Sequence, residues 1–366
     1  MKLKRVVLWS AVAIPLALAA TGLIAYIRSD NECGDPGLRA ASQPMKAVIY
    51  CEYGSPAVLR FESVEKPVPR DSQVLVRVRA AALNPLDWHF MRGTPYIARL
   101  GIGLRKPAEI RLGVDFAGVV EAVGRSVTRF KPGDEVFGGR TGAFAEYVTV
   151  SENGVVAKPA RLTFEQAAAV PVAALTALQG LRDIGRLQPG QKVLVNGASG
   201  GVGTFAVQIA KSFGAHVTGV CSTRNVELVT SIGADRVIDY TRQNFTEGAE
   251  PYDLILDNVG NHALRDVRRV LAPAGTYVMI GGPSGRWIAP MTRVLSVMVQ
   301  SRFVSQELRF FISQLNRDDL EALRLLMESG KVTPVIDRTY PFVEIAAAMA
   351  YLEEGHARGK VVITMD

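Results

Sequence analysis

A glycine-rich turn between a strand and a helix restricts the possible folds of this chain more than any other feature. Residues 192–203 read KVLVNGASGGVG, and they are followed by the helix-forming run TFAVQIAKSFGA and a second apolar strand, HVTGVC. A strand, a glycine turn, a helix and a further strand make half of a dinucleotide-binding βαβ unit. Loops of this kind also occur as simple turns, but the flanking strand and amphipathic helix supply the context that the binding motif requires.

The glycines of this turn have separate expected roles. Gly197 permits the tight turn, and Gly203 lets the helix pack closely on the sheet. Gly200 and Gly201 let bare backbone approach a pyrophosphate. A helix that begins near Val202 points its unpaired amide groups at the phosphates. The turn residues assigned to cofactor binding are Gly197, Ala198, Gly200, Gly201, Val202 and Gly203.

Strands and helices continue to alternate after this turn. Beyond Pro189-Gly190 the pattern predicts strands near residues 192–196, 217–221, 236–238, 253–257 and 275–280, with helices between them. This order is typical of a parallel, doubly wound α/β sheet. Because such sheets bind ligands beyond the carboxyl ends of their strands, we also expect cofactor contacts at the strand ends, from Asn258, Val259, Gly281 and Gly282.

The end of the second strand decides between the two nicotinamide dinucleotides. The sequence there is CSTRN, which has no acidic residue to bind a ribose 2′-hydroxyl. Small hydroxyls and a guanidinium suit a 2′-phosphate, so Ser222 and Arg224 are expected to contact it and NADPH is expected to be preferred over NADH. Tyr240 and Lys211 are further candidates for contacts around this phosphate. Alternatively, each of these residues is an ordinary surface residue.

The region from Met45 onwards is rich in short strands. VLVRVR alternates apolar and charged residues, as expected of a half-buried strand, and a barrel-like region of such strands ends near AEYVTV. A helical connection, broken at Pro171, leads to the glycine turn, and the carboxyl-terminal tail returns to strands that rejoin the first region. We expect a β-barrel domain of residues 45–165 and 311–366, and a nucleotide-binding domain of residues 166–310.

Composition excludes several other classes of protein. The chain has a net charge of +7, but no basic run interleaved with aromatic residues, so nucleic acid is not an expected partner. Cys33, Cys51 and Cys221 make neither a disulfide framework nor a metal-binding spacing, and this pattern favours a reducing compartment.

A series of short motifs follows in order along the chain. They read MKAVIYCEYGSPAVL, ALNPLDWHFMRG, GVDFAGVVEAVG, FKPGDEVFG, AAAVPVAALTAL, VLVNGASGGVG, GADRVIDY and GKVVI. In this order they resemble the medium-chain dehydrogenase/reductase superfamily, and most closely its zinc-free quinone oxidoreductase and enone reductase branch. The resemblance implies a GroES-like β-barrel domain plus a Rossmann domain, an active site in the cleft between them, and a homodimer.

The zinc-binding residues of metal-dependent relatives are missing here. Those relatives have Cys where this chain has Asn84, and Gly-His-Glu where it has Gly113-Val114-Asp115. The four histidines are scattered and no cysteine lies between Cys51 and Cys221, so we expect no metal site. Hydride transfer would then require an acceptor that is already electrophilic, such as a quinone or an α,β-unsaturated carbonyl compound.

The resemblance also implies catalytic positions. The Asn that matches Asn84 lies beside the cofactor ring in relatives, and the Thr that matches Thr176 lies near the nicotinamide. Many quinone-reducing relatives have Tyr at the position of His89, where a His could donate to an oxyanion or transfer a proton. We therefore expect Asn84, His89 and Thr176 to be catalytic, whereas Asp87 is expected only to cap a helix. Alternatively, each of these residues has only a structural role.

Three functions remain open at this stage. The favoured one is an NADPH-dependent quinone or enone reductase. The second is a zinc-free NAD(P)-dependent alcohol or carbonyl dehydrogenase, and the third is a non-enzymatic, membrane-tethered NADPH sensor.

The amino-terminal segment predicts a membrane anchor. Residues 6–27 carry no charge and are numerous enough to cross a bilayer, with Trp9 and Tyr26 near the two ends. A signal peptide cleaved near Ala17-Leu18-Ala19 is the alternative, but the apolar run continues past that site. The basic residues before the span favour an inside amino terminus, which would put the enzyme outside. The need for soluble cofactor favours a cytoplasmic catalytic domain, and we therefore expect the catalytic domain to be cytoplasmic.

Residues 286–311 form one more unusual stretch. It is apolar with arginines spaced along it. We expect a buried or dimer-forming helix here, with a cationic face that touches lipid as the alternative.

Overall fold

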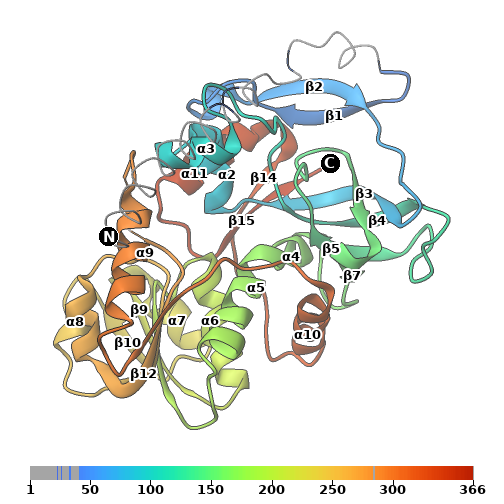
Figure 1. Ribbon diagram of the computed structural model, residues 1–366. Helices are drawn as coiled ribbons and strands as arrows, with labels where there is room; N and C mark the ends of the chain where they lie inside the picture. Colours follow the sequence, from blue (N-terminus) through green and yellow to red (C-terminus); the bar gives the residue numbers. More distant parts are fainter. Residues whose placement is uncertain (1–22, 24–25, 27–32, 34–40, 283–284, 366) are drawn as a thin grey trace, which may run out of the picture.

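The computed structural model describes residues 23, 26, 33, 41–282 and 285–365. They form two sheet-based regions that lie side by side, each with its own hydrophobic core (Figure 1). The carboxyl-terminal tail returns to the strand-rich region that begins at Met45, as the sequence predicts. This return brings residues from both ends of the chain to the boundary between the two sheets.

One region contains, among the described residues, a six-stranded sheet in the order β10-β9-β8-β11-β12-β13, with every pair parallel. Five of these strands were predicted to within a few residues, whereas β13 was not predicted as a strand. The strands are β8 (Lys192–Asn196), β9 (His216–Cys221), β10 (Arg236–Asp239), β11 (Tyr252–Asp257), β12 (Leu271–Met279) and β13 (Glu307–Phe310).

Helices cover both faces of this sheet (Figure 1). Val193 and Val195 of β8 belong to the core beneath α5 and α6, whereas Leu194 faces the opposite core, beneath α8 and α9. Because successive side chains of a strand point to opposite faces, a strand buried on both sides has to be apolar throughout. The helices are α5 (Pro171–Gln179), α6 (Gly201–Ser212), α7 (Val226–Ser231), α8 (Leu264–Arg269) and α9 (Ala289–Gln300).

The second sheet is mostly antiparallel. In the described part of the chain its order is β14-β15-β3-β4-β5-β7, with β6 also paired to β3. Val76 and Val78 of β3 are buried and Arg77 and Arg79 are exposed, which is the alternation predicted for VLVRVR. The strands are β3 (Gln73–Ala82), β4 (Asp115–Val123), β5 (Glu135–Gly139), β6 (Tyr147–Ser151), β7 (Val155–Ala157), β14 (Ile336–Pro341) and β15 (Lys360–Thr364), and a separate pair is formed by β1 (Pro44–Ile49) and β2 (Arg60–Glu65).

Short helices connect and cover this second sheet. The Thr163 hydroxyl accepts a hydrogen bond from the Gln166 backbone N–H at 3.2 Å and so caps the first helix of the connection. The next helix, α5, begins at Pro171, which confirms the predicted break. The remaining helices are α2 (Pro85–Arg92), α3 (Arg99–Ile102), α4 (Phe164–Ala168), α10 (Arg317–Glu328) and α11 (Ile345–Glu353).

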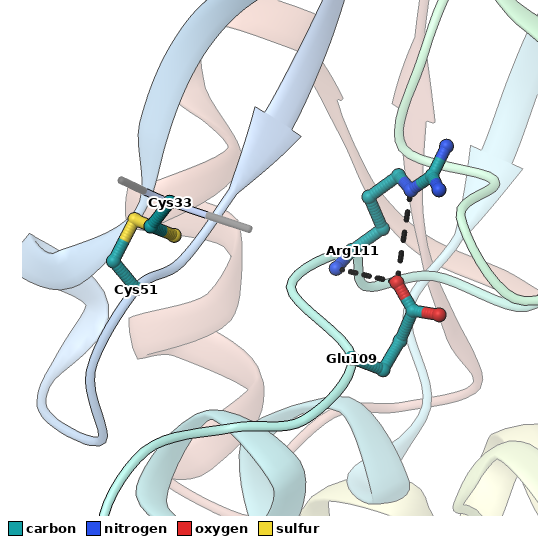
Figure 2. The surroundings of a disulfide bond; sticks show 4 residues. All are labelled: Cys33, Cys51, Glu109 and Arg111. Atoms are coloured by element: carbon teal, nitrogen blue, oxygen red, sulfur yellow. Dashed lines mark hydrogen bonds and ion pairs between the residues drawn. A yellow bond between two sulfur atoms is a disulfide. The ribbon is translucent and has the colours of Figure 1, made fainter. Parts of the chain in front are cut away.

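The cysteines correct one expectation from the sequence. Cys33 and Cys51 form a disulfide (Figure 2), so the predicted absence of a disulfide is wrong and the expectation of a reducing compartment loses its basis. Only Cys221 is a free cysteine among the described residues, and it is buried. No spacing pattern indicates this pairing, because two cysteines 18 positions apart meet only through the tertiary structure.

The predicted membrane anchor, residues 6–27, lies outside the described residues except for Leu23 and Tyr26. Within the described ranges, the structure contains no helix with the length and apolar character needed to span a membrane.

The unusual stretch after residue 286 forms α9 and then β13. Val294 and Val297 of α9 are buried against the sheet, whereas Met291, Leu295 and Met298 are exposed. The prediction of a buried helix therefore holds for one face only, and the other is an apolar surface. We call the side chains of Met291, Leu295 and Met298 the α9 stripe.

Candidate active site

Residues from both sheets line a cavity of about 640 Å³. The carboxyl ends of β8 and β9 and the turn after β11 form one wall, and α2 with the segment between α11 and β15 forms the other. This is the place where parallel α/β sheets bind ligands. The predicted site residues that line it are Asn84, Gly197, Gly200, Gly201, Val202, Gly203, Ser222, Arg224, Tyr240, Asn258, Val259 and Gly282, whereas His89, Thr176, Ala198 and Gly281 do not.

The glycine turn has little room for side chains. Gly197 has a φ of +78°, which favours glycine. A Cβ atom on Gly203 would lie 2.0 Å from the Gly197 carbonyl oxygen, and one on Gly281 would lie 2.0 Å from the Asn258 carbonyl oxygen. Gly200 is the residue before the first turn of α6, so the free amides of that helix point into the cavity. These features fit a bound pyrophosphate.

Polar side chains gather at the end of β9. Arg224 donates to the His356 carbonyl oxygen at 2.8 Å, a contact between the two walls of the cavity. Asn225 donates to the Ser199 hydroxyl at 2.9 Å, and its buried Oδ1 has no partner among the described residues. Sequence reasoning overlooked Asn225, although it lies beside the predicted Ser222 and Arg224. Lys211 instead forms an ion pair with Asp235 and is not among the lining residues.

A buried network fixes the turn after β11. Asp257 accepts hydrogen bonds from the Asn196 side chain and from the Gly260 backbone N–H, both at 2.8 Å. Its other oxygen accepts from the Tyr277 hydroxyl at 2.8 Å, and burial raises the pKa of that hydroxyl. Arg293 donates to the same hydroxyl at 3.1 Å. This network holds Asn258 and Val259 at the cavity, and it explains why an acidic residue is buried at the end of a strand.

Three buried polar side chains meet on the opposite wall. Lys360 donates from Nζ to Asn84 Oδ1 at 2.6 Å and to Asp115 Oδ2 at 3.1 Å, and Asn84 donates to the same Asp115 oxygen at 2.9 Å. Lys360 is only 3% exposed and Asp115 is fully buried, so each charge is compensated by the other. Asp115 and Lys360 both lie within motifs of the sequence, but those motifs predict no role for Lys360. The only signal was a lysine at the start of an otherwise apolar strand.

Asp87, in the first turn of α2, holds the backbone of Asn84 in place. It accepts from the Asn84 backbone N–H at 2.7 Å and from the Gly113 backbone N–H at 3.2 Å, so its expected helix-capping role is confirmed. Burial raises the pKa of Asp87 to about 7, and the nearby Asp115 carboxylate adds to this shift.

The side chains of His89 and Thr176 both contact other groups of the protein. The His89 ring lies 2.9 Å from the Thr94 carbonyl oxygen through Nδ1 and stacks on Trp88, and burial lowers its pKa. In a neutral ring whose Nδ1–H donates to that carbonyl, Nε2 can only accept. The Thr176 hydroxyl contacts the Val172 carbonyl oxygen at 2.7 Å and Ser313 Oγ at 2.9 Å. Both residues therefore have structural partners outside the cavity lining.

The donor set does not suit a metal ion. Across the part of the chain that the structure describes, no three His, Cys, Asp or Glu side chains come together as metal ligands. Asn84 and Lys360 line the cavity instead, with the buried Asp115 hydrogen-bonded to both of them, and an ammonium group is not a metal ligand.

Comparison with known proteins gives the family. The model of the alcohol dehydrogenase GroES-like domain matches residues 70–160, and that of the zinc-binding dehydrogenases matches residues 232–363. The mitochondrial NAD(P)H oxidoreductase RTN4IP1 of Bos taurus is 37% identical over 361 residues, covering 88% of this chain and 90% of that protein. The 2-methylene-furan-3-one reductase of Solanum lycopersicum is 37% identical over 370 residues, covering 96% of this chain and 85% of that protein.

A solved structure agrees with these matches. The quinone oxidoreductase from Coxiella burnetii has a TM-score of 0.76 and 32% identity, and the alignment covers 88% of this chain and 100% of that one. The two sheets are thus a GroES-like domain and a Rossmann domain. This chain therefore belongs to the medium-chain dehydrogenase/reductase superfamily, in the branch of the quinone oxidoreductases and enone reductases, and is an NAD(P)H-dependent oxidoreductase.

Proposed function

We propose that this protein transfers hydride from NADPH to quinones or α,β-unsaturated carbonyl compounds without a metal ion. The observation that carries the proposal is the pair Lys360 and Asn84, which line the cavity together with the glycine turn and are held there by the buried Asp115. The names of the tomato and Coxiella relatives support an enone or quinone as acceptor.

Lys360 supplies the donor that such a reaction needs. A lysine ammonium has three N–H groups, and Asn84 and Asp115 take two of them. The third is left for a ligand oxygen, where a fixed positive charge stabilises the negative charge that develops on an acceptor carbonyl. NADPH supplies the hydride when it is bound. The protein's part is to orient the acceptor, hold Lys360 in place and exclude water.

The preference for NADPH depends on the β9 end of the cavity. Ser222 and Arg224 line the cavity there, and no acidic side chain is among the lining residues of that end. A guanidinium forms paired hydrogen bonds to phosphate oxygens, so we propose that Arg224 exchanges its contact with the His356 carbonyl for the 2′-phosphate.

The test of the activity is an acceptor screen with the full chain. We expect loss of NADPH absorbance with 1,4-quinones and 2-alkenals, unchanged by a metal chelator. Turnover of saturated aldehydes alone would favour the alcohol dehydrogenase alternative. Tight NADPH binding with no oxidation by any acceptor would favour a sensor.

Domain limits and assembly complete the proposal. We place the GroES-like domain at residues 45–165 and 311–366, and the Rossmann domain at residues 166–310. β13 is the last strand of its sheet, and the exposed α9 stripe lies next to it in the chain. We propose that these two features form the interface of a homodimer.

The uncharged segment of residues 6–27 supports a membrane anchor. The full chain should then remain with membranes after alkaline extraction, whereas a variant without residues 1–27 should not. Release of the full chain by the same treatment would contradict the anchor.

A further inference from the structure

A second cavity, of about 320 Å³, lies in the GroES-like domain and shares no lining residue with the active-site cavity. Its lining comes from β6, from the start of β1 and from three segments, 67–73, 109–111 and 140–145. Nothing in the proposed reaction uses this cavity.

Arginines dominate the charge of this second cavity. Arg70, Arg111 and Arg140 line it, and Glu109 is the one acidic residue among the lining residues that the structure describes. Glu109 is already engaged, because its Oε1 accepts from the Arg111 backbone N–H at 3.1 Å and lies 3.6 Å from Arg111 Nε (Figure 2). The lining therefore carries an excess of two positive charges.

Two of these guanidinium groups have no counter-charge within the part of the protein that the structure describes. The structure gives the side chains of Arg70 and Arg140 no hydrogen bond or ion pair with any described residue, although both face the same cavity. Like charges that face one cavity repel, and an anion bound in that cavity would relieve the repulsion.

The arginines are carried on fixed backbone. Arg111 forms an isolated β-bridge with Ile49 at the end of β1, and the Arg140 backbone N–H donates to the Val114 carbonyl oxygen at 2.8 Å. Thr149 of β6, which carries a hydroxyl group, belongs to the same lining, as does Tyr147, whose ring contacts Lys66. Guanidinium forks and hydroxyl groups on a rigid frame are the donors that recognise phosphate oxygens.

We propose that this second cavity binds the phosphate group of a small molecule. A phosphate monoester carries about 1.5 to 2 negative charges at neutral pH, which matches the excess positive charge of the lining. The volume of about 320 Å³ also admits a compact organic group attached to the phosphate. The proposal does not depend on the activity assigned to the other cavity.

The test measures binding of inorganic phosphate to the full chain by calorimetry at constant ionic strength, with and without saturating NADPH. We expect saturable binding that persists with NADPH, because the two cavities share no residue. Arg140→Gln and Arg70→Gln should each weaken phosphate binding about tenfold, the usual effect of losing a charge-assisted hydrogen bond. NADPH affinity should not change in these variants, which shows that they are folded.

Arg265→Gln is the matched control, because Arg265 is a highly exposed arginine on α8 of the other domain. It should bind phosphate like the natural chain. Absence of saturable binding to the natural chain, equal binding by Arg140→Gln and Arg265→Gln, or loss of binding when NADPH is added would each overturn the proposal.

Discussion

Lys360 is the residue on which the proposed chemistry most depends. It is charged and almost fully buried, and it is kept so by one carboxylate and one amide oxygen. Removing one partner of a buried pair leaves an uncompensated charge, so a single substitution changes both stability and reactivity. Variants have to separate the two effects.

We expect Lys360→Met combined with Asp115→Asn to fold, because both buried charges are removed together. The double variant should lose on the order of a hundredfold in kcat, the typical effect of deleting one oxyanion donor, with little change in NADPH affinity. Steady-state kinetics and NADPH titration measure the two quantities. A loss of NADPH affinity with kcat preserved would assign Lys360 to the cofactor phosphates instead.

His89 provides the contrasting case on the same wall. His89 lies outside the cavity lining. Its Nδ1 contacts the Thr94 carbonyl oxygen, and burial lowers its pKa, so the ring is neutral at pH 7. His89→Gln should therefore change kcat less than about threefold while lowering the melting temperature, by loss of a buried contact. A large fall in kcat with an unchanged melting temperature would restore the catalytic role that the sequence predicts.

Asp87 predicts a pH dependence of stability. An unfolded Asp ionises near pH 4, whereas folded Asp87 keeps its proton up to about pH 7. Between these values the unfolded state has fewer protons, so this group makes folding less favourable as pH rises. Relative to Asp87→Asn, the natural chain should lose about 4 kcal/mol of unfolding free energy between pH 4 and pH 7. Urea unfolding of both proteins checks this; a constant difference would contradict it.

At the scale of elements, the glycine turn and α6 form one unit. The turn is recognisable in the sequence because its requirements are local: a positive φ at Gly197 and close contact between Gly203 and the turn. α2 has the same local character, since the residues that cap it lie within one turn. Such elements depend on neighbours in the sequence, and periodicity and capping signals find them.

Gly203→Ala and Gly200→Ala test this unit as a pair. A Cβ atom at Gly203 would lie 2.0 Å from the Gly197 carbonyl oxygen, whereas at Gly200 the nearest atom is 3.6 Å away. We expect Gly203→Ala to lower stability by about 1–3 kcal/mol and to weaken NADPH binding at least tenfold, through displacement of the turn. Gly200→Ala should fold normally. Equal behaviour of the two variants in thermal unfolding would show that the close contact does not matter.

At the scale of the whole molecule, the exposed α9 stripe raises the question of what covers it. An apolar helix face beside the last strand of a sheet is typical of a protein interface. Leu295→Glu should convert the proposed homodimer to monomers, as measured by light scattering on the purified protein. Leu325→Glu, on an exposed position of α10, is the control and should leave the dimer intact. A monomeric natural chain that binds lipid vesicles through the α9 stripe would support the lipid alternative.

The sequence by itself determined the Rossmann unit and the alternating strands of the second sheet, because periodicity, glycines and caps act over a few residues. Tertiary structure alone decided which polar residues meet. Asn84 and Lys360 are 276 positions apart and touch only because β15 pairs with β3. The same holds for the Cys33–Cys51 disulfide and the arginine-lined cavity. Contacts between distant segments depend on how the sheets assemble, and no local pattern records them.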